Sequence, residues 1–207
     1  MPFIFTQIAP YEAGTAEQMV KGYMALYMEQ AWKRSADKNT AMLTLYDLPL
    51  EHMRNGESSH PIHPRTKTPV AERFALAAMN MVYGGDDEYT APVYKSMEIK
   101  GDVAYVKLDR VGNGGLKTTD GSANVHGFTI AGADGVFVNA EAEIVDKDTV
   151  KVWSSYVEKP QNVIYAFSDM SQGSNLCNSV GIPASPFRTV ELNDTVGKPN
   201  AALKYFV

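Results

Sequence analysis

The chain has 207 residues, which is long enough to bury a substantial core in one large domain or two small ones. Its 24 acidic residues outnumber its 19 Lys and Arg residues, and the net charge of −5 argues against nucleic-acid binding, which requires a basic surface. No apolar run reaches the roughly 18 residues of a membrane-spanning helix. The single cysteine, Cys177, can form neither an intrachain disulfide nor a thiolate metal cluster. The N-terminal residues lack the basic region and cleavage site of a signal peptide.

The first 87 residues alternate between strand and helix patterns. Short apolar runs predict strands at residues 3–8 and 40–46. A helical spacing of apolar residues predicts a helix at residues 16–33. A second helix is expected to begin at Pro69, with Thr68 as its N-cap, and to end at Gly84-Gly85. This alternation predicts an α/β domain over residues 1–87, with helices covering a parallel sheet.

The remaining residues, 88–207, predict a second, β-rich module of antiparallel strands. Residues 93–99 and 103–108 flank Lys100-Gly101-Asp102, which is a hairpin signal. Residues 124–131 and 136–145 flank a second turn, and further strands are expected at 150–154 and 162–167. The aromatic residues of these strands are expected to pack in the core rather than to stack on a ligand.

Histidines provide the candidate catalytic base. Three of the four, His52, His60 and His63, lie in a loop after the second predicted strand, and His126 lies apart from them. Loops at the carboxyl ends of parallel strands are where α/β proteins place their sites. Prolines on both sides of the Ile62-His63 pair would hold the His63 imidazole in place, although a solvated loop histidine is the simpler interpretation.

Two other chemistries are weaker alternatives. His52, Glu57, His60 and His63 offer zinc ligands, but the prolines exclude a helical ligand pair, so no metal or other cofactor is expected. Ser174 lies in a Ser-Gln-Gly-Ser-Asn segment between strands. This is not the strand-to-helix turn that presents a nucleophilic serine in α/β hydrolases.

Six segments, in this order, resemble the C-terminal half of the sialate O-acetylesterase family (sialic acid-specific 9-O-acetylesterases), which are SGNH-type hydrolases. The segments are residues 2–11, Ile62-His63-Pro64-Arg65 with the following Val70-Ala71-Glu72-Arg73, and residues 94–99, 111–116, 127–135 and 181–189. The resemblance implies a partial SGNH-type, flavodoxin-like three-layer α/β sheet followed by the antiparallel β-rich module. It also implies hydrolysis of acetyl esters on sugars or glycans, and an extracytoplasmic location. In this family a serine attacks the acetyl carbonyl, and the histidine that accepts its proton corresponds to His63.

The sequence departs from the family in two respects. The nucleophile of the family lies in a Gly-Gln-Ser-Asn segment upstream of the stretch matched by residues 2–11, and this chain contains no such segment. The acid that often precedes the histidine is replaced by His60 and Pro61, which leaves Asp47 and Glu57 as the nearest upstream acids. We therefore expect the chain alone to be weakly active or inactive. Its partner would be an upstream segment or chain that carries the serine.

Two alternatives remain open at this point. The chain could be a non-catalytic glycan-binding or structural relative that has lost the serine, or an esterase that uses Ser58, Ser59 or Ser174 of its own. The missing part of the sheet would expose apolar surface, so self-association is also expected.

Overall fold

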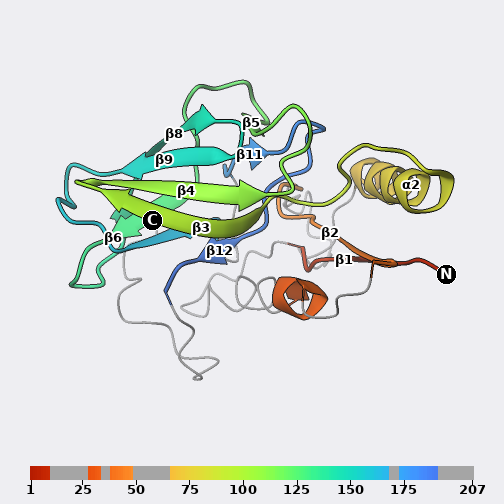
Figure 1. Ribbon diagram of the computed structural model, residues 1–207, viewed down its shortest axis with the longest axis horizontal. Helices are drawn as coiled ribbons and strands as arrows, with labels where there is room; N and C mark the ends of the chain where they lie inside the picture. The colour runs from red at the N-terminus through yellow and green to blue at the C-terminus, as the bar shows by residue number, and fades with distance from the viewer. Residues whose placement is uncertain (10–27, 34–37, 49–65, 168–172, 191–207) are drawn as a thin grey trace, which may run out of the picture.

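The computed structural model describes residues 1–9, 28–33, 38–48, 66–167 and 173–190 (Figure 1). Most of the regular structure in these residues is β-strand, and a helical segment at 28–33 and the helix α2 accompany the strands. In chain order the elements are β1 (Phe3–Thr6), β2 (Thr40–Leu43), α2 (Thr68–Tyr83), β3 (Val93–Lys100), β4 (Val103–Asp109), β5 (Lys117–Thr118), β6 (Phe128–Ala131), β7 (Val138–Asn139), β8 (Glu141–Asp146), β9 (Thr149–Trp153), β10 (Asn162–Tyr165), β11 (Leu176–Cys177) and β12 (Phe187–Arg188).

Three antiparallel sheets form the larger part of the structure. One has the strand order β3-β4-β9-β8, a second has the order β12-β10-β6-β7, and the third is the pair β11-β5. Buried and more exposed residues alternate along β4, as expected for a strand with one face on a core. The hairpin predicted around Lys100-Gly101-Asp102 is confirmed, since β3 pairs with β4 across Gly101, which adopts a φ of 63°.

The antiparallel sheets share one hydrophobic core. Apolar residues of β4, β8 and β9, among them Ala104 and Ala142, face β6 and β10 there. The fully buried members of this core include Val106, Val150 and Val163. The rings of Phe128, Tyr165 and Phe187 lie together, with the Phe128 and Tyr165 centroids 4.7 Å apart. Tyr46, Tyr165 and Phe187 are at most 3% exposed, so the prediction that the aromatic residues are core residues is confirmed for these three. It is wrong for Tyr156, which is 86% exposed.

The N-terminal strands form a two-stranded parallel pair rather than a partial three-layer sheet. β1 pairs with β2 in parallel, with Phe3 opposite Thr40 and Thr6 opposite Leu43, and α2 contacts β2. The expected partial SGNH-type, flavodoxin-like three-layer α/β sheet is therefore wrong. The described residues contain this one parallel pair, and every other strand pairing among them is antiparallel. The periodicity located β1, β2 and α2, whereas the helix predicted at 16–33 lies outside the described residues except for 28–33. Periodicity carries no information on how many strands join one sheet.

Helix α2 follows the sequence signals closely. It begins at Thr68 with Lys67 as its N-cap, so the predicted cap at Thr68 is wrong by one residue. Proline occupies the first turn, where its missing N–H costs no hydrogen bond. Gly84 ends the helix in the left-handed conformation, with a φ of 78°.

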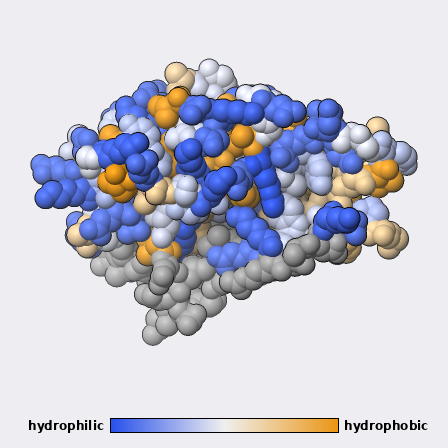
Figure 2. Space-filling model, in the orientation of Figure 1, coloured by the Kyte–Doolittle hydropathy of each residue, from blue (hydrophilic) through white to orange (hydrophobic). Residues whose placement is uncertain are grey.

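Apolar side chains are exposed at the end of the molecule that carries β1 and α2. Phe3 is 63% exposed, and Met79, Val82 and Tyr83 of α2 are exposed as well. Figure 2 shows hydrophobic residues scattered among hydrophilic ones over this face, at the α2 end and over the sheet region alike. Among the residues described, no helix has the length and apolar character to cross a membrane.

Candidate functional site

The candidate site lies at the carboxyl end of β2. The chain continues from β2 through the buried residues Thr44, Leu45 and Tyr46 to Asp47, and a backbone hydrogen bond from Leu48 N to Leu45 O closes a turn. The predicted base His63 lies outside the described residues, as do His52, His60, Glu57, Ser58 and Ser59. The structure describes the two ends of the segment that carries them, at Leu48 and Thr66.

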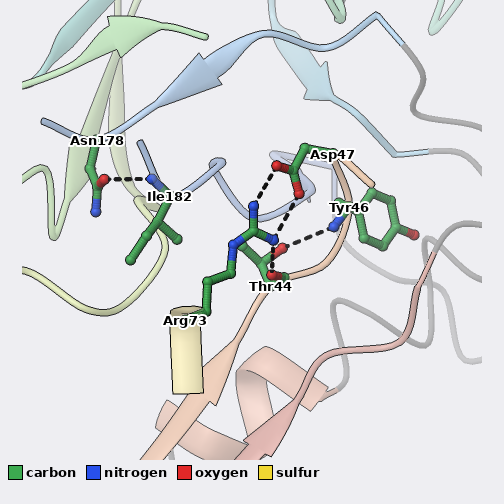
Figure 3. A network of polar contacts seen from close by, with 6 residues as sticks. All are labelled: Thr44, Tyr46, Asp47, Arg73, Asn178 and Ile182. Carbon is green, nitrogen blue, oxygen red and sulfur yellow. Dashed lines mark hydrogen bonds and ion pairs between the residues drawn. The ribbon is translucent and has the colours of Figure 1, made fainter. Parts of the chain in front are cut away.

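An ion pair between Arg73 and Asp47 joins these two ends (Figure 3). Arg73 Nη1 donates to Asp47 Oδ1 at 2.9 Å, and Nη2 donates to Asp47 Oδ2 at 2.5 Å. Arg73 Nη1 also donates to the backbone carbonyl of Thr44 at 2.7 Å. The two side chains are 10% and 22% exposed, so the pair is largely shielded from water. The first turns of α2 are thereby fixed to the end of β2 by a bidentate contact.

Hydrogen bonds connect this edge of the parallel pair to the C-terminal part of the structure. Gln7 follows β1 and is fully buried; its backbone N–H donates to Leu43 O at 2.7 Å, and its Nε2 donates to Ser185 Oγ at 2.9 Å. The Ser185 N–H in turn donates to Pro92 O. The segment around Ser185 therefore packs on the end of β1 and connects it to the residues before β3.

Asn178 holds the same segment in its turn (Figure 3). Its Oδ1 accepts hydrogen bonds from the backbone N–H groups of Ile182 at 2.8 Å and Val180 at 3.2 Å. Its Nδ2 donates to Thr90 O at 3.0 Å. Because Asn178 is fully buried, these bonds satisfy polar groups that water cannot reach.

Asp47 is close enough to two buried groups to act on their ionisation. Burial raises the pKa of the Cys177 thiol to about 11, and the negative charge of Asp47 contributes in the same direction. Burial also raises the pKa of the Tyr165 phenol, and the charge of Asp47 again contributes. Both groups are therefore neutral near pH 7, and Cys177 has no thiolate character there.

Ser174 and His126 lie in a different part of the structure. Burial raises the pKa of the Tyr165 phenol, and the Ser174 side chain opposes that change. The neighbouring Asn175 accepts a hydrogen bond from the His126 backbone N–H at 2.7 Å and donates to Asn124 O at 3.0 Å. These contacts give Ser174 and its neighbours a structural role in joining two loops.

Sequence reasoning missed the role of Arg73, although a signal was present. Apolar residues recur at helical spacing along α2, among them Val70, Phe74 and Ala77. Arg73 lies three residues after Val70 and four before Ala77, so it shares their face, and it is one of the buried residues of the helix. A charged residue on an apolar stripe requires a buried partner, and Asp47 is that partner.

Titratable side chains do not gather into a metal site in the described part of the chain, which holds no group of three or more His, Cys, Asp or Glu residues suited to an ion. The polar side chains of Gln7, Asn175 and Asn178 make hydrogen bonds, and Asp47 and Arg73 form an ion pair.

No protein-family model and no curated protein matches the sequence. Among solved structures, the chain is similar to a carbohydrate acetylesterase from Xanthomonas citri, with 34% sequence identity and a TM-score of 0.74. The match covers 92% of this chain and 41% of that protein, so this chain spans less than half of its length. Over nearly all of its residues, the chain is thus similar in sequence and in structure to one part of a carbohydrate acetylesterase.

Proposed function

We propose that this chain is the histidine-bearing part of a carbohydrate O-acetylesterase that acts on acetylated sugars of the sialate type. The observation that carries the proposal is the 34% identity to a carbohydrate acetylesterase over 92% of the chain. The ion pair between Asp47 and Arg73 supports it, because it fixes both ends of the segment that contains His63.

In the proposed reaction a serine oxygen attacks the acetyl carbonyl carbon, and His63 accepts the serine proton. Collapse of the tetrahedral intermediate breaks the bond to the sugar oxygen, which takes that proton from His63 and leaves as a hydroxyl group. Water then hydrolyses the acetyl-serine with His63 again as the base, which releases acetate and restores the serine. General base catalysis of this kind contributes about 10²- to 10⁴-fold to the rate.

The serine is proposed to lie on another polypeptide segment that packs beside β1. Parallel strands normally belong to larger sheets with both faces covered, yet β1 pairs with β2 alone among the described residues. Phe3 of β1 is 63% exposed, and the exposed side chains of Met79 and Tyr83 lie on α2. A docking segment would cover this apolar surface and complete the sheet.

A serine-hydrolase probe tests where the nucleophile lies. We expect the purified 207-residue chain to show no change in intact mass after treatment with a fluorophosphonate. An adduct that disappears in the His63→Ala variant would contradict this part of the proposal, because the chain would then hold an activated serine of its own.

Acetate release tests the function itself. The chain is co-expressed with the polypeptide encoded immediately upstream of Met1, and the purified assembly is given 9-O-acetylated sialic acid or acetylated xylo-oligosaccharides. We expect turnover that His63→Ala lowers by at least about 10³-fold and that the control His126→Ala leaves unchanged. Turnover of the xylan substrate alone would refute the sialate type. Binding of either sugar without turnover would support a glycan-binding relative instead.

A further inference from the structure

A cavity of about 530 Å³ lies apart from the Asp47–Arg73 pair. Its walls come from three places in the chain: the helical segment 28–33 with residues 38–40, the acidic segment 86–90, and residues 110–113 after β4. Thr40, which lines this cavity, begins β2, whereas Asp47 follows the end of that strand. The cavity is therefore at the other end of β2 from the proposed ester-hydrolysis site.

Arg110 and Trp32 form the most distinctive part of the wall. The guanidinium carbon of Arg110 lies 3.9 Å from the centroid of the Trp32 ring, and Trp32 Nε1 donates a hydrogen bond to Thr40 O at 3.2 Å. Arg110 has a φ of 61°, a left-handed conformation that is strained for a residue with a Cβ atom. Such strain is concentrated at functional sites, and here it places a cation over an indole ring.

Two buried polar atoms beside this stack have no hydrogen-bond partner within the described part of the chain. One is a donor, Arg110 Nη1, and the other is an acceptor, Glu29 Oε2. The other carboxylate oxygen of Glu29 pairs with Lys33 Nζ at 2.8 Å. Burial lowers the pKa of the Arg110 guanidinium, while the charges of Glu88 and Glu29 oppose that change, so both acids act on Arg110. Buried groups of this kind normally have partners. Arg110 lines the cavity and Glu29 does not, so the unpartnered guanidinium nitrogen is the group that a ligand in the cavity would complete.

The balance of charges indicates which ligand fits. Three cationic residues line the cavity, Lys33, Lys38 and Arg110, together with three acidic residues at positions 86–88. An anion would be repelled by the acids, and a cation by Arg110 and the lysines. A neutral hydroxyl group donates and accepts hydrogen bonds at once, and so satisfies both kinds of group. The rings of Trp32 and Tyr89 add apolar surface of the type that packs on a sugar ring.

We propose that this cavity binds a neutral sugar through its hydroxyl groups, with Arg110 as the main hydrogen-bond donor. The proposal does not require ester hydrolysis. It would give the chain a second carbohydrate contact, at the other end of β2 from the Asp47–Arg73 pair.

Fluorescence of Trp32 tests the proposal. The chain has two tryptophans, so the Trp153→Phe variant leaves Trp32 as the single reporter. This protein is titrated with glucose, galactose, xylose and N-acetylglucosamine, and separately with glucuronate and sulfate. We expect a saturable change with at least one neutral sugar at millimolar concentration, and none with the two anions.

Two further variants identify the donor. Arg110→Gly should retain the fold, because glycine adopts a φ near 61° without strain, and it should weaken sugar binding by about 10- to 100-fold. The control Lys100→Ala removes an exposed cation whose Nζ lies 5.3 Å from the Tyr105 ring, and it should leave binding unchanged. The proposal is overturned if no neutral sugar gives a saturable change, if Arg110→Gly binds as tightly as the parent, or if only the anions bind.

Discussion

Arg73 of α2 holds Asp47 by both carboxylate oxygens, at 2.9 and 2.5 Å, across the whole of the segment that separates them in sequence. The same guanidinium also reaches the carbonyl of Thr44 at the end of β2. One side chain thus connects a strand end, a turn and a helix start.

Breaking this pair should destabilise the protein. Asp47→Asn leaves Arg73 as a buried charge without its counter-ion, and Arg73→Met leaves the Asp47 carboxylate in the same state. We expect each change to lower the free energy of unfolding by about 2–4 kcal/mol, because both side chains are largely shielded from water. The double variant should lose clearly less unfolding free energy than the two single variants lose in sum. Urea unfolding measures all four proteins of this cycle.

The exposed ion pair between Lys95 and Asp109 is the matched control for that cycle. Its atoms are 2.7 Å apart, but the two side chains are 54% and 51% exposed. Because water screens this pair, the changes in unfolding free energy of the corresponding Lys95 and Asp109 variants should be additive within error. Equal coupling in the two cycles would show that burial does not set the strength of the Asp47–Arg73 pair.

The sequence predicted features that depend on neighbouring residues. The proline in the first turn of α2 and the glycine at its end located the helix, and Lys100-Gly101-Asp102 located the hairpin between β3 and β4. Each of these signals acts over a few residues, so no knowledge of the rest of the fold is required.

Long-range pairings could not be predicted in the same way. Gln7 and Ser185 are 178 residues apart and hydrogen-bond each other, and no local pattern indicates that contact. The same is true of β10, whose partners β6 and β12 come from distant parts of the chain. The expectation of a partial three-layer α/β sheet in residues 1–87 failed for this reason. The proposed base His63 lies outside the described residues and stays a prediction.

Gly127 is expected to tolerate no side chain. Its φ is 102°, and a Cβ atom at this position would lie 2.9 Å from Ser174 Cβ. Gly127→Ala should therefore lower the free energy of unfolding by about 2–4 kcal/mol, through backbone strain and overpacking together. Gly121 has a φ of 73° but open space around it, so Gly121→Ala should cost only about 1–2 kcal/mol. Thermal unfolding measures the loss of stability in both variants, and the difference between them is the contribution of overpacking. Equal losses of stability would show that the contact with Ser174 does not destabilise the Gly127→Ala variant.

The phenol of Tyr165 is expected to contribute through one backbone hydrogen bond. Its oxygen accepts from the Leu176 N–H at 3.0 Å, and both residues are fully buried or nearly so. Tyr165→Phe leaves that N–H without its partner, so we expect a loss of about 1–3 kcal/mol in the free energy of unfolding. Tyr156 is 86% exposed, and Tyr156→Phe should change stability by less than about 0.5 kcal/mol. If the Tyr165→Phe protein were as stable as the parent, the Leu176 N–H would have to find another acceptor.

Cys177 should make the stability of the protein depend on alkaline pH. Its thiol is fully buried and its pKa is raised to about 11, whereas an unfolded chain ionises cysteine near pH 8.5. Between these values the unfolded state has lost a proton that the folded state retains. Ionisation therefore favours unfolding, and the free energy of unfolding falls as pH rises through this window.

Cys177→Ala isolates this effect from the other groups that titrate at high pH. Below pH 8 the free energies of unfolding of the parent and the variant should differ by a constant amount, which reflects packing alone. Between pH 8.5 and 11 the parent should lose more stability than the variant, by a total on the order of 2–3 kcal/mol, because each unit of pKa difference corresponds to about 1.4 kcal/mol. Urea unfolding at a series of pH values measures both curves. Parallel curves throughout would mean that the folded thiol ionises as readily as the unfolded one, and that Asp47 and burial do not hold Cys177 in its neutral form.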